Sequence, residues 1–437
     1  MYRKYNIRAF SHQLKLSILS CQQNVPANIL EESVNNSRRV LLHLYHLPYL
    51  NNMKAAVFHK PGDISYTTVA DPRIELATDI ILKVTSTAIC GSDLHILSGA
   101  VPQSTDMVMG HEFMGIVEEV GAEVKNLKKG DRVIVPFPIA CGSCFFCNHG
   151  ASPSCENSNY KHYGPNGDLM DQKGAALFGY TDLYGGYSGG QAEYVRVPYA
   201  DVSPRIIPDN ITDEQALFLT DIFPTGWSGV DWAQLKGGEV VAIFGSGPVG
   251  LMAQKAAWLH GASRVIAIDP LDYRLEKAKA VNNVDILNPH KVDVVAAIRE
   301  MTAGRGADVC IDAVGFEPER NLLDKLKATI NFEKGSMKVL EMCFEAVRRS
   351  GTVSILGVYG SPYDNFPLFR IFDKGITIKQ GQAPVLNYID KLIELVKEEK
   401  VVLDDIITHT MPLSDVSKAY KIFDEKDDDC VKVVLKP

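Results

Sequence analysis

The chain has no run of about 18 uncharged apolar residues, the length that a membrane-spanning helix needs, so no membrane span is expected. It has no block of basic residues, and its formal net charge is −8, which makes nucleic acid an unexpected partner. Internal repeats and low-complexity tracts are also absent from the sequence. Together with an apolar fraction of 46% and a charged fraction of 22%, these absences predict a soluble globular protein.

Length and local pattern divide the chain. Its 437 residues exceed what one ordinary core holds, so two domains are expected. A continuous pattern begins only at Met53, in MKAAVF. We expect residues 1–52 to be a disordered extension or a spurious upstream reading. The alternative is a targeting segment, although the apolar core of a secretory signal is missing. A start at Met53 predicts a cytoplasmic protein.

Two different patterns of predicted secondary structure follow Met53. Short β-like runs broken by glycine continue to about Pro204 and include Ile80–Thr85, Gly115–Val120 and Asp131–Pro136. After about Asp213, strands alternate with helices, which implies βαβ units on a parallel sheet. These segments are Glu239–Phe244, Pro248–Leu259, Arg264–Asp269, Tyr273–Val281, Asp308–Asp312, Lys338–Arg349 and Thr352–Leu356. An amphipathic helix at Leu386–Lys400 and a strand at Val431–Leu435 close the chain.

The predicted fold is therefore α/β with two parts. A β-rich catalytic domain is built from residues 53–212 and 386–437. A doubly wound parallel-sheet domain of residues 213–385, which binds a dinucleotide, is inserted between them. Ligands of such sheets bind at the carboxyl ends of the strands, so the active site is expected in the cleft between the two domains.

A dinucleotide site is predicted where the strand Glu239–Phe244 leads into Gly245-Ser-Gly247-Pro-Val-Gly250 and then a helix. Gly245 permits the tight turn, Gly247 lets the backbone approach a pyrophosphate, and Gly250 lets helix and strand pack closely. Asp269, nineteen residues after Gly250, is placed to accept hydrogen bonds from ribose hydroxyls. Its charge repels a 2′-phosphate, which favours NAD over NADP. The alternative is an unrelated turn with a solvated aspartate.

Four of the nine cysteines lie within fifteen residues, as Cys141, Cys144, Cys147 and Cys155. Four thiolates suit a closed tetrahedral zinc site that holds a loop, in a reducing compartment. An iron–sulfur cluster is the main rival, because C-x₂-C-x₂-C also begins a ferredoxin motif. The fourth cysteine of that motif comes sooner and precedes proline. Four unliganded cysteines are the remaining alternative.

Two further motifs, Cys90-Gly-Ser-Asp-Leu-His95 and Gly110-His111-Glu112, lie in the β-rich part. A catalytic zinc needs three protein ligands and one open position, and Cys90 and His111 are suitable for two of the three. Each residue alone is more often a core cysteine or a structurally paired histidine.

From Met53 to Pro437 the sequence resembles the zinc-dependent medium-chain alcohol dehydrogenases. The matching segments are CGSDLH, GHEFMGIVEEVG, KKGDRVIV, the cysteine loop and GSGPVG, in the expected order. The segments GGYSGGQAEYVRVPYAD and FLTDIFPTGW, and the long stretch after Gly315, are most similar to the glutathione-independent formaldehyde dehydrogenases.

The resemblance implies roles for individual residues. Cys90, His111 and Asp221 are then ligands of a catalytic zinc, and Glu112 is an acid able to approach the metal. Asp93 is then the carboxylate that orients His111, while Ser92 and His95 relay a proton. The competing interpretations are that Asp221 is a helix-adjacent acid without a metal, that Ser92 and Asp93 cap a helix, and that His95 is an exposed helical residue.

The function expected from the resemblance is hydride transfer between NAD and a small alcohol or hydrated aldehyde. It implies one catalytic and one structural zinc per chain, and a homodimer or homotetramer. A secondary-alcohol or polyol dehydrogenase is the alternative, and a catalytically silent dinucleotide-binding protein is a third hypothesis. Segments near Gly185–Gln191 and Glu317–Gly335 are candidates to cover a permanently held nicotinamide.

Overall fold

The computed structural model describes residues 52–101, 103, 106–159, 174–315, 337–359 and 366–437. The prediction for residues 1–52 therefore lies outside the described residues except at Asn52, as does the proposed cover at Glu317–Gly335. Among the described residues, no helix is both long enough and apolar enough to cross a membrane.

The first part of the chain is rich in short strands, as expected. Its strands are β1 (Asn52–Lys60), β2 (Asp63–Ala70), β3 (Ile80–Ala88), β4 (Met107–Val108), β5 (Glu112–Val120), β6 (Arg132–Val135), β7 (Pro138–Ile139), β8 (Ala176–Leu177), β9 (Tyr194–Val197) and β10 (Arg205–Ile206). Its helices are α3 (Gly91–Leu97), α4 (Phe145–Asn148), α5 (Asp213–Leu217) and α6 (Ile222–Asp231).

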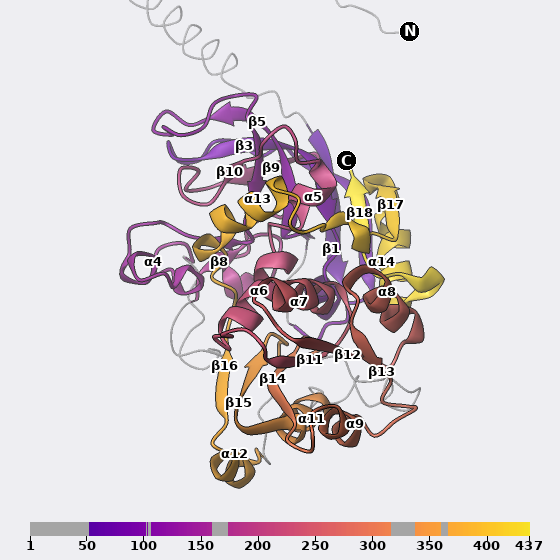
Figure 1. Ribbon diagram of the computed structural model, residues 1–437. Helices are drawn as coiled ribbons and strands as arrows, with labels where there is room; N and C mark the ends of the chain where they lie inside the picture. The colour runs from indigo at the N-terminus through magenta and orange to yellow at the C-terminus, as the bar shows by residue number, and fades with distance from the viewer. Residues whose placement is uncertain (1–51, 102, 104–105, 160–173, 316–336, 360–365) are drawn as a thin grey trace, which may run out of the picture. The chain divides into compact units, whose positions relative to one another are not determined.

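The end of the chain returns to these strands. After α13 (Ile389–Lys397) come β17 (His409–Pro412), α14 (Val416–Glu425) and β18 (Val433–Lys436). The largest sheet of this part has the order β10-β6-β5-β3-β18-β17, and β18 pairs antiparallel with β3. Figure 1 shows β17 and β18, in yellow, beside the strands of the first part. The pairing supports the assignment of the C-terminal residues to the β-rich domain, while the exact boundaries stay predictions.

The middle of the chain forms a parallel sheet with the order β13-β12-β11-β14-β15-β16. Its strands are β11 (Val240–Phe244), β12 (Arg264–Ile268), β13 (Asp285–Leu287), β14 (Ala307–Asp312), β15 (Val347–Ile355) and β16 (Thr377–Gln380). The helices between them are α7 (Pro248–Leu259), α8 (Asp272–Asn282), α9 (Val294–Met301), α11 (Lys338–Ala346) and α12 (Leu368–Lys374). All five strand pairs are parallel, so the doubly wound sheet is confirmed.

Alternate residues of β11 face two different cores, as the two-residue period of a strand requires. Val241 and Ile243 pack in one core with residues of α7, whereas Ala242 and Phe244 pack in another with residues of α9 and α11. Figure 1 shows α7 on one side of the sheet and α9 and α11 on the other. The chain leaves β11 toward β12 on one side and returns as β14 on the other, so the strand order reverses between β11 and β14.

One predicted element is wrong at its end. The helix expected at Lys338–Arg349 stops at Ala346, because Val347 already has extended backbone angles and pairs with Ala307 of β14. The strand β15 therefore begins five residues before the predicted Thr352. Its first residues also include a salt bridge from Arg348 Nε to Asp308 Oδ1 at 2.6 Å.

Gly250 offers a test of how α7 is seated on the sheet. A Cβ at this position would lie 1.9 Å from the carbonyl oxygen of Gly245. We predict that Gly250→Ala lowers the free energy of unfolding by about 1–3 kcal/mol in urea titrations, the usual cost of overpacking. Gly247→Ala is the matched control, since its Cβ would meet nothing closer than Arg274 Nη1 at 3.6 Å. Equal stabilities of the two variants would contradict this packing.

Candidate active site

The glycine loop lies at the carboxyl end of β11. Gly245 has φ 97°, and a Cβ there would lie 2.8 Å from a side-chain carbon of Val314, so the turn requires glycine. Gly247 is the N-cap of α7, whose first residue is Pro248. The N-terminus of α7 therefore presents backbone N–H groups and a positive dipole end next to a residue with no side chain. This arrangement suits a pyrophosphate.

Asp269 follows directly after β12 and is only 3% exposed. Its Oδ2 accepts the N–H of Ser246 at 2.8 Å, and its Oδ1 accepts the N–H of Leu271 at 2.9 Å. The carboxylate thus ties the glycine loop to the end of the next strand, and it keeps acceptor capacity for a ribose. Arg274, which the sequence analysis did not identify, has Nη1 3.9 Å from Asp269 Oδ2.

A second buried carboxylate lies where the strand order reverses. Asp312, at the end of β14, accepts backbone N–H groups from Val314 at 3.0 Å and Gly315 at 3.3 Å. Tyr359 donates its hydroxyl to the other oxygen at 2.6 Å. Burial raises the pKa of Asp312, and these donors oppose the shift. Asp312 therefore clamps the loops after β14 and β15 beside the glycine loop.

The first candidate metal centre is assembled by three element ends. Cys90 follows β3 and is the N-cap of α3, His111 precedes β5, and Asp221 is the N-cap of α6. Asp221 Oδ2 lies 3.3 Å from His111 Nε2 and 3.6 Å from Cys90 Sγ. With Glu112, these residues place ligand atoms within 4.8 Å of one another, and all four are buried. The residues implied by the resemblance are therefore together in space.

The chemistry of this donor set fits a cation. Burial and the nearby Asp221 carboxylate raise the pKa of the Cys90 thiol. Glu112 Oε2 is buried without a hydrogen-bond partner among the described residues. Buried polar groups without partners are costly, and a metal ion relieves the repulsion among acidic ligands. One sulfur, one imidazole nitrogen and one carboxylate oxygen are ligands that zinc accepts, with a fourth position left for water or substrate.

Asp93 lies behind His111. Its Oδ1 is 3.2 Å from His111 Nδ1, and its Oδ2 accepts the N–H of Cys90 at 2.9 Å. Although burial lowers the pKa of His111, Asp93 is the first group that raises it, and the pKa ends well above its usual value. The contact favours a proton on Nδ1, which leaves the Nε2 lone pair for a metal. The geometry is that of an orienting carboxylate, and Asp93 also completes a capping box at α3.

The structure does not match the alternative roles considered for Ser92, a helix cap, and for His95, an exposed helical residue. The N-cap of α3 is Cys90, not Ser92. Ser92 Oγ lies 3.2 Å from His111 Nε2, beside the ligand set. His95 is 9% exposed, so the alternative of an exposed helical histidine is wrong. The proton relay through Ser92 and His95 stays a proposal.

Glu112 has a partner that the sequence analysis missed. Lys432 Nζ lies 2.6 Å from Glu112 Oε1 and donates to the carbonyl oxygen of Ile89 at 2.9 Å, and both charged side chains are fully buried. Although burial lowers the pKa of Lys432, Glu112 raises it overall, so the lysine stays charged. The available signal was a single lysine inside the apolar closing segment Val431–Leu435. Phe137 and Tyr180 border the site, with ring centroids 6.3 Å and 6.2 Å from that of His111.

The second candidate metal centre is the cysteine loop around α4. Cys141 Sγ and Cys147 Sγ are 4.0 Å apart, as are Cys144 Sγ and Cys155 Sγ, and the four sulfurs lie within 4.8 Å of one another. A disulfide would need about 2.0 Å, whereas a tetrahedral zinc with four thiolates needs sulfurs about 3.8 Å apart.

Further donors point at these sulfurs. The backbone N–H of Cys141 lies 3.3 Å from Cys155 Sγ, and Asn157 Nδ2 lies 3.3 Å from Cys141 Sγ. Such N–H groups stabilise thiolates that bind a metal. The loop therefore has the spacing and surroundings of a closed structural zinc site, and the four side chains converge rather than scatter through a core.

The segment Gly185–Gln191 packs next to the candidate metal centre formed by Cys90, His111 and Asp221. Gly189, Gly190 and Gln191 are buried, and their backbone N–H groups bond to the carbonyl oxygens of Val108, Gly110 and Met109. This end of the segment packs directly against the residues before His111.

Comparison with known proteins gives two family matches. Residues 77–209 match the alcohol dehydrogenase GroES-like domain, and residues 248–329 match the zinc-binding dehydrogenase domain. An uncharacterized zinc-type alcohol dehydrogenase-like protein of Bacillus subtilis is 46% identical over 389 residues, which cover 88% of this chain and 100% of that protein. The glutathione-independent formaldehyde dehydrogenase of Bacillus subtilis is 33% identical, over 86% of this chain and 95% of that protein.

Among solved structures, the alcohol dehydrogenase TADH from Thermus sp. ATN1 superposes with a TM-score of 0.76. The two sequences are 34% identical, and the alignment covers 88% of this chain and 99% of the other.

Proposed function

Because this chain belongs to the zinc-type medium-chain alcohol dehydrogenase family, we propose that it transfers a hydride between NAD and a small alcohol or hydrated aldehyde. The fold is accordingly a GroES-like catalytic domain joined to a Rossmann domain with a parallel sheet. The observation that carries the proposal is the convergence of Cys90, His111 and Asp221 on one buried point with Ser92 Oγ beside it.

The proposed ligands of a catalytic zinc are Cys90, His111 and Asp221, and those of a structural zinc are the four loop cysteines. When bound at the first centre, zinc supplies a Lewis acid that polarises the substrate oxygen. Ser92 accepts a hydrogen bond from the substrate hydroxyl and passes its proton toward His95. Asp93 holds His111, and Lys432 holds Glu112 beside the site, from which Glu112 can move toward the metal.

The dinucleotide is proposed to lie across the carboxyl ends of β11 and β14. Gly245, Gly247 and Gly250 make room for the pyrophosphate at the N-terminus of α7. Asp269 accepts the adenosine ribose hydroxyls, which favours NAD. The hydride chemistry itself belongs to the nicotinamide, and the loops clamped by Asp312 support that half of the cofactor.

The proposal also names a class of substrates. Asp221 in place of the cysteine common in alcohol dehydrogenases, and the 33% identity with a formaldehyde dehydrogenase, favour short aldehydes and alcohols. A hydrated aldehyde presents a hydroxyl to the metal as an alcohol does, so one site serves both. A secondary alcohol or polyol is the second candidate. A cytoplasmic location likewise stays a prediction.

The experiment combines metal content with turnover. We predict two zinc ions per purified chain, and NAD reduction with formaldehyde or ethanol exceeding that with sorbitol. Cys90→Ser is expected to leave one zinc and lower kcat/KM by at least about 10³-fold, since the loss of about 4 kcal/mol of transition-state stabilisation is typical for a lost electrophile. Cys310→Ser is the control, because Cys310 is buried in the parallel-sheet core.

One zinc per wild-type chain without turnover would contradict the ligand assignment of Cys90, His111 and Asp221. Faster reduction with sorbitol than with formaldehyde or ethanol would instead favour the polyol candidate.

Cofactor choice gives an independent prediction. Asp269→Ser removes the charge that opposes a 2′-phosphate and leaves Arg274 close by, at 3.9 Å from the original carboxylate. The preference for NAD over NADP should fall by about 10–100-fold, because a hydrogen bond to a charged group contributes about 1.5–3 kcal/mol. The preference is read from kcat/KM for both cofactors. Asp285→Ser, on the neighbouring strand β13, is the control, and an unchanged ratio in Asp269→Ser would refute the assignment.

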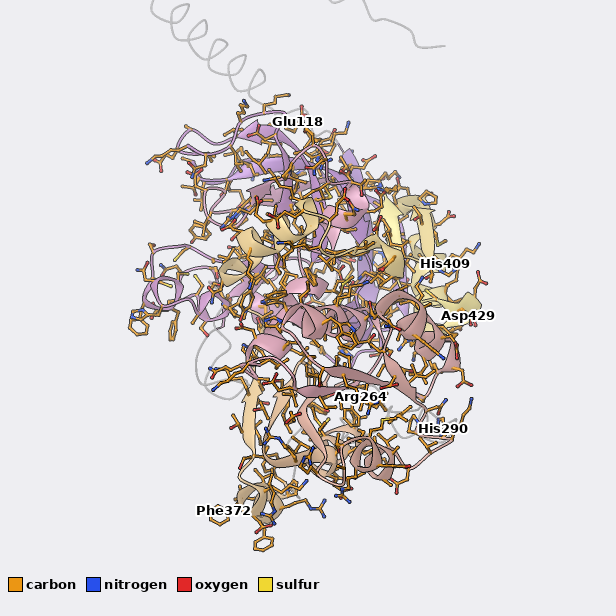
Figure 2. All side chains as sticks on the ribbon, in the orientation of Figure 1. Glu118, Arg264, His290, Phe372, His409 and Asp429 are labelled. Carbon is orange, nitrogen blue, oxygen red and sulfur yellow. The ribbon has the colours of Figure 1, made fainter. Side chains whose placement is uncertain are left out.

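A homo-oligomer is proposed through the edge of the parallel sheet. On α12, Phe369 is 84% exposed and Phe372 is 83% exposed, and β16 is the edge strand next to it. Figure 2 shows Phe372 directed outward from α12. An edge strand beside an apolar helix face is a suitable self-complementary interface, with a second copy as the partner.

Replacing both phenylalanines by serine should therefore lower the sedimentation coefficient to that of a smaller species. Val402→Ser, an exposed residue elsewhere (48%), should leave it unchanged. An identical oligomer in the double variant would contradict this interface.

A further inference from the structure

A chain of buried hydrogen bonds connects the C-terminal helix α14 with His111. It begins at Tyr420 on α14, passes through Gln191 before β9, and ends at Asp93 on α3. The three side chains are 1%, 0% and 0% exposed. Gln191 lies 98 positions from Asp93 and 229 positions from Tyr420 in sequence, so the three side chains come from separate segments of the chain.

The direction of each bond follows from the groups themselves. Gln191 Nε2 lies 3.2 Å from the carbonyl oxygen of Ala88 and 3.4 Å from Asp93 Oδ2, and both of these atoms only accept. The amide nitrogen must therefore face them, and the amide oxygen faces Tyr420, whose hydroxyl donates at 2.9 Å. Burial raises the pKa of Tyr420 well above its usual value, so the hydroxyl keeps its proton.

The amide completes the surroundings of Asp93. Asp93 Oδ2 accepts one hydrogen bond from Gln191 and one from the N–H of Cys90, so this oxygen is held by two donors. The other oxygen, Oδ1, lies 3.2 Å from His111 Nδ1. A fully buried carboxylate needs such donors to keep its charge and orientation.

Gln191 also contacts the turn that precedes His111. A Cβ on Gly110 would lie 2.4 Å from Gln191 Cγ, and the backbone N–H of Gln191 bonds to the carbonyl oxygen of Met109 at 2.9 Å. The same residue thus touches both the backbone that carries His111 and the carboxylate that orients its ring.

We propose that Gln191 and Tyr420 are positioning residues for the catalytic metal. They fix the orientation of Asp93, which keeps a proton on His111 Nδ1 and directs Nε2 toward Cys90 and Asp221. This role rests on the proposed zinc site. Without the Tyr420 hydroxyl, the Gln191 amide oxygen loses its donor, and the orientation of the amide depends only on the two bonds made by its nitrogen.

The test measures zinc affinity rather than turnover. Chelator competition gives the dissociation constants of both zinc ions in each variant, and the four-cysteine site serves as an internal reference. Gln191→Leu should weaken the Cys90 site by about 10–100-fold, the usual effect of losing an outer partner of a ligand. Tyr420→Phe should weaken it by about tenfold or less while keeping the ring. The four-cysteine site should be unchanged in both.

Two further variants separate positioning from packing. Gln191→Glu keeps the size but adds a negative charge beside Asp93, so it should weaken zinc binding more than Gln191→Leu does. Tyr388→Phe is the matched control, because its hydroxyl donates to Asp231 Oδ2 at 3.0 Å away from this chain of bonds. Cobalt substituted at the Cys90 site should show an altered visible spectrum in the Gln191 variants and an unaltered one in Tyr388→Phe.

Unchanged zinc affinity at the Cys90 site in both Gln191→Leu and Tyr420→Phe would overturn the positioning role, even if thermal stability falls. Tyr420→Phe, which deletes a single oxygen, keeps the test decisive if a Gln191 variant fails to fold. A wild-type protein that binds zinc only at the four cysteines would overturn the proposed catalytic site itself, and the positioning role with it.

Discussion

The structure depends on how buried negative charge is balanced around Cys90. Three buried carboxylates, Asp93, Glu112 and Asp221, lie with the buried Cys90 thiol, and the buried Lys432 pairs with Glu112. Lys432 neutralises Glu112, and Asp93 is held by N–H donors and His111. Asp221 and the thiol share the remaining unfavourable interaction, which a divalent cation converts into coordination. The folded arrangement is therefore matched to a metal at this point.

This requirement explains why distant segments meet here. β3, β5 and α6 deliver the proposed ligands at their ends, while the C-terminal segment supplies Lys432 and Tyr420 through the pairing of β18 with β3. The parallel sheet is interposed between these segments in sequence and offers the glycine loop at the reversal of its strand order. Lys255 on α7 contacts Asp405 from the C-terminal segment at 2.7 Å, so the two sets of elements also share a salt bridge.

Local pattern was sufficient for most of the fold. The helix Pro248–Leu259 matches α7 at both ends, and the glycine spacing predicts the turn that Gly245 and Gly250 require. Val347 was misassigned to a helix because a helix and a strand meet there without a glycine or proline between them. The four-cysteine site was found from spacing alone, since its four ligands are close in sequence. Asp221 required a family resemblance, because 110 residues separate it from His111 and no local pattern marks it. Lys432, Gln191 and Tyr420 were missed for the same reason: their roles arise only from tertiary contacts.

Cys90, His111 and Asp221 are proposed to hold a metal ion beside the dinucleotide site. Diffraction from zinc-loaded crystals on both sides of the zinc absorption edge tests it most directly. Two anomalous peaks per chain are expected. One is surrounded by the four loop cysteines, and the other lies within about 2.0–2.3 Å of Cys90 Sγ, His111 Nε2 and an Asp221 oxygen. A single peak at the loop cysteines, with none between Cys90, His111 and Asp221, would contradict it.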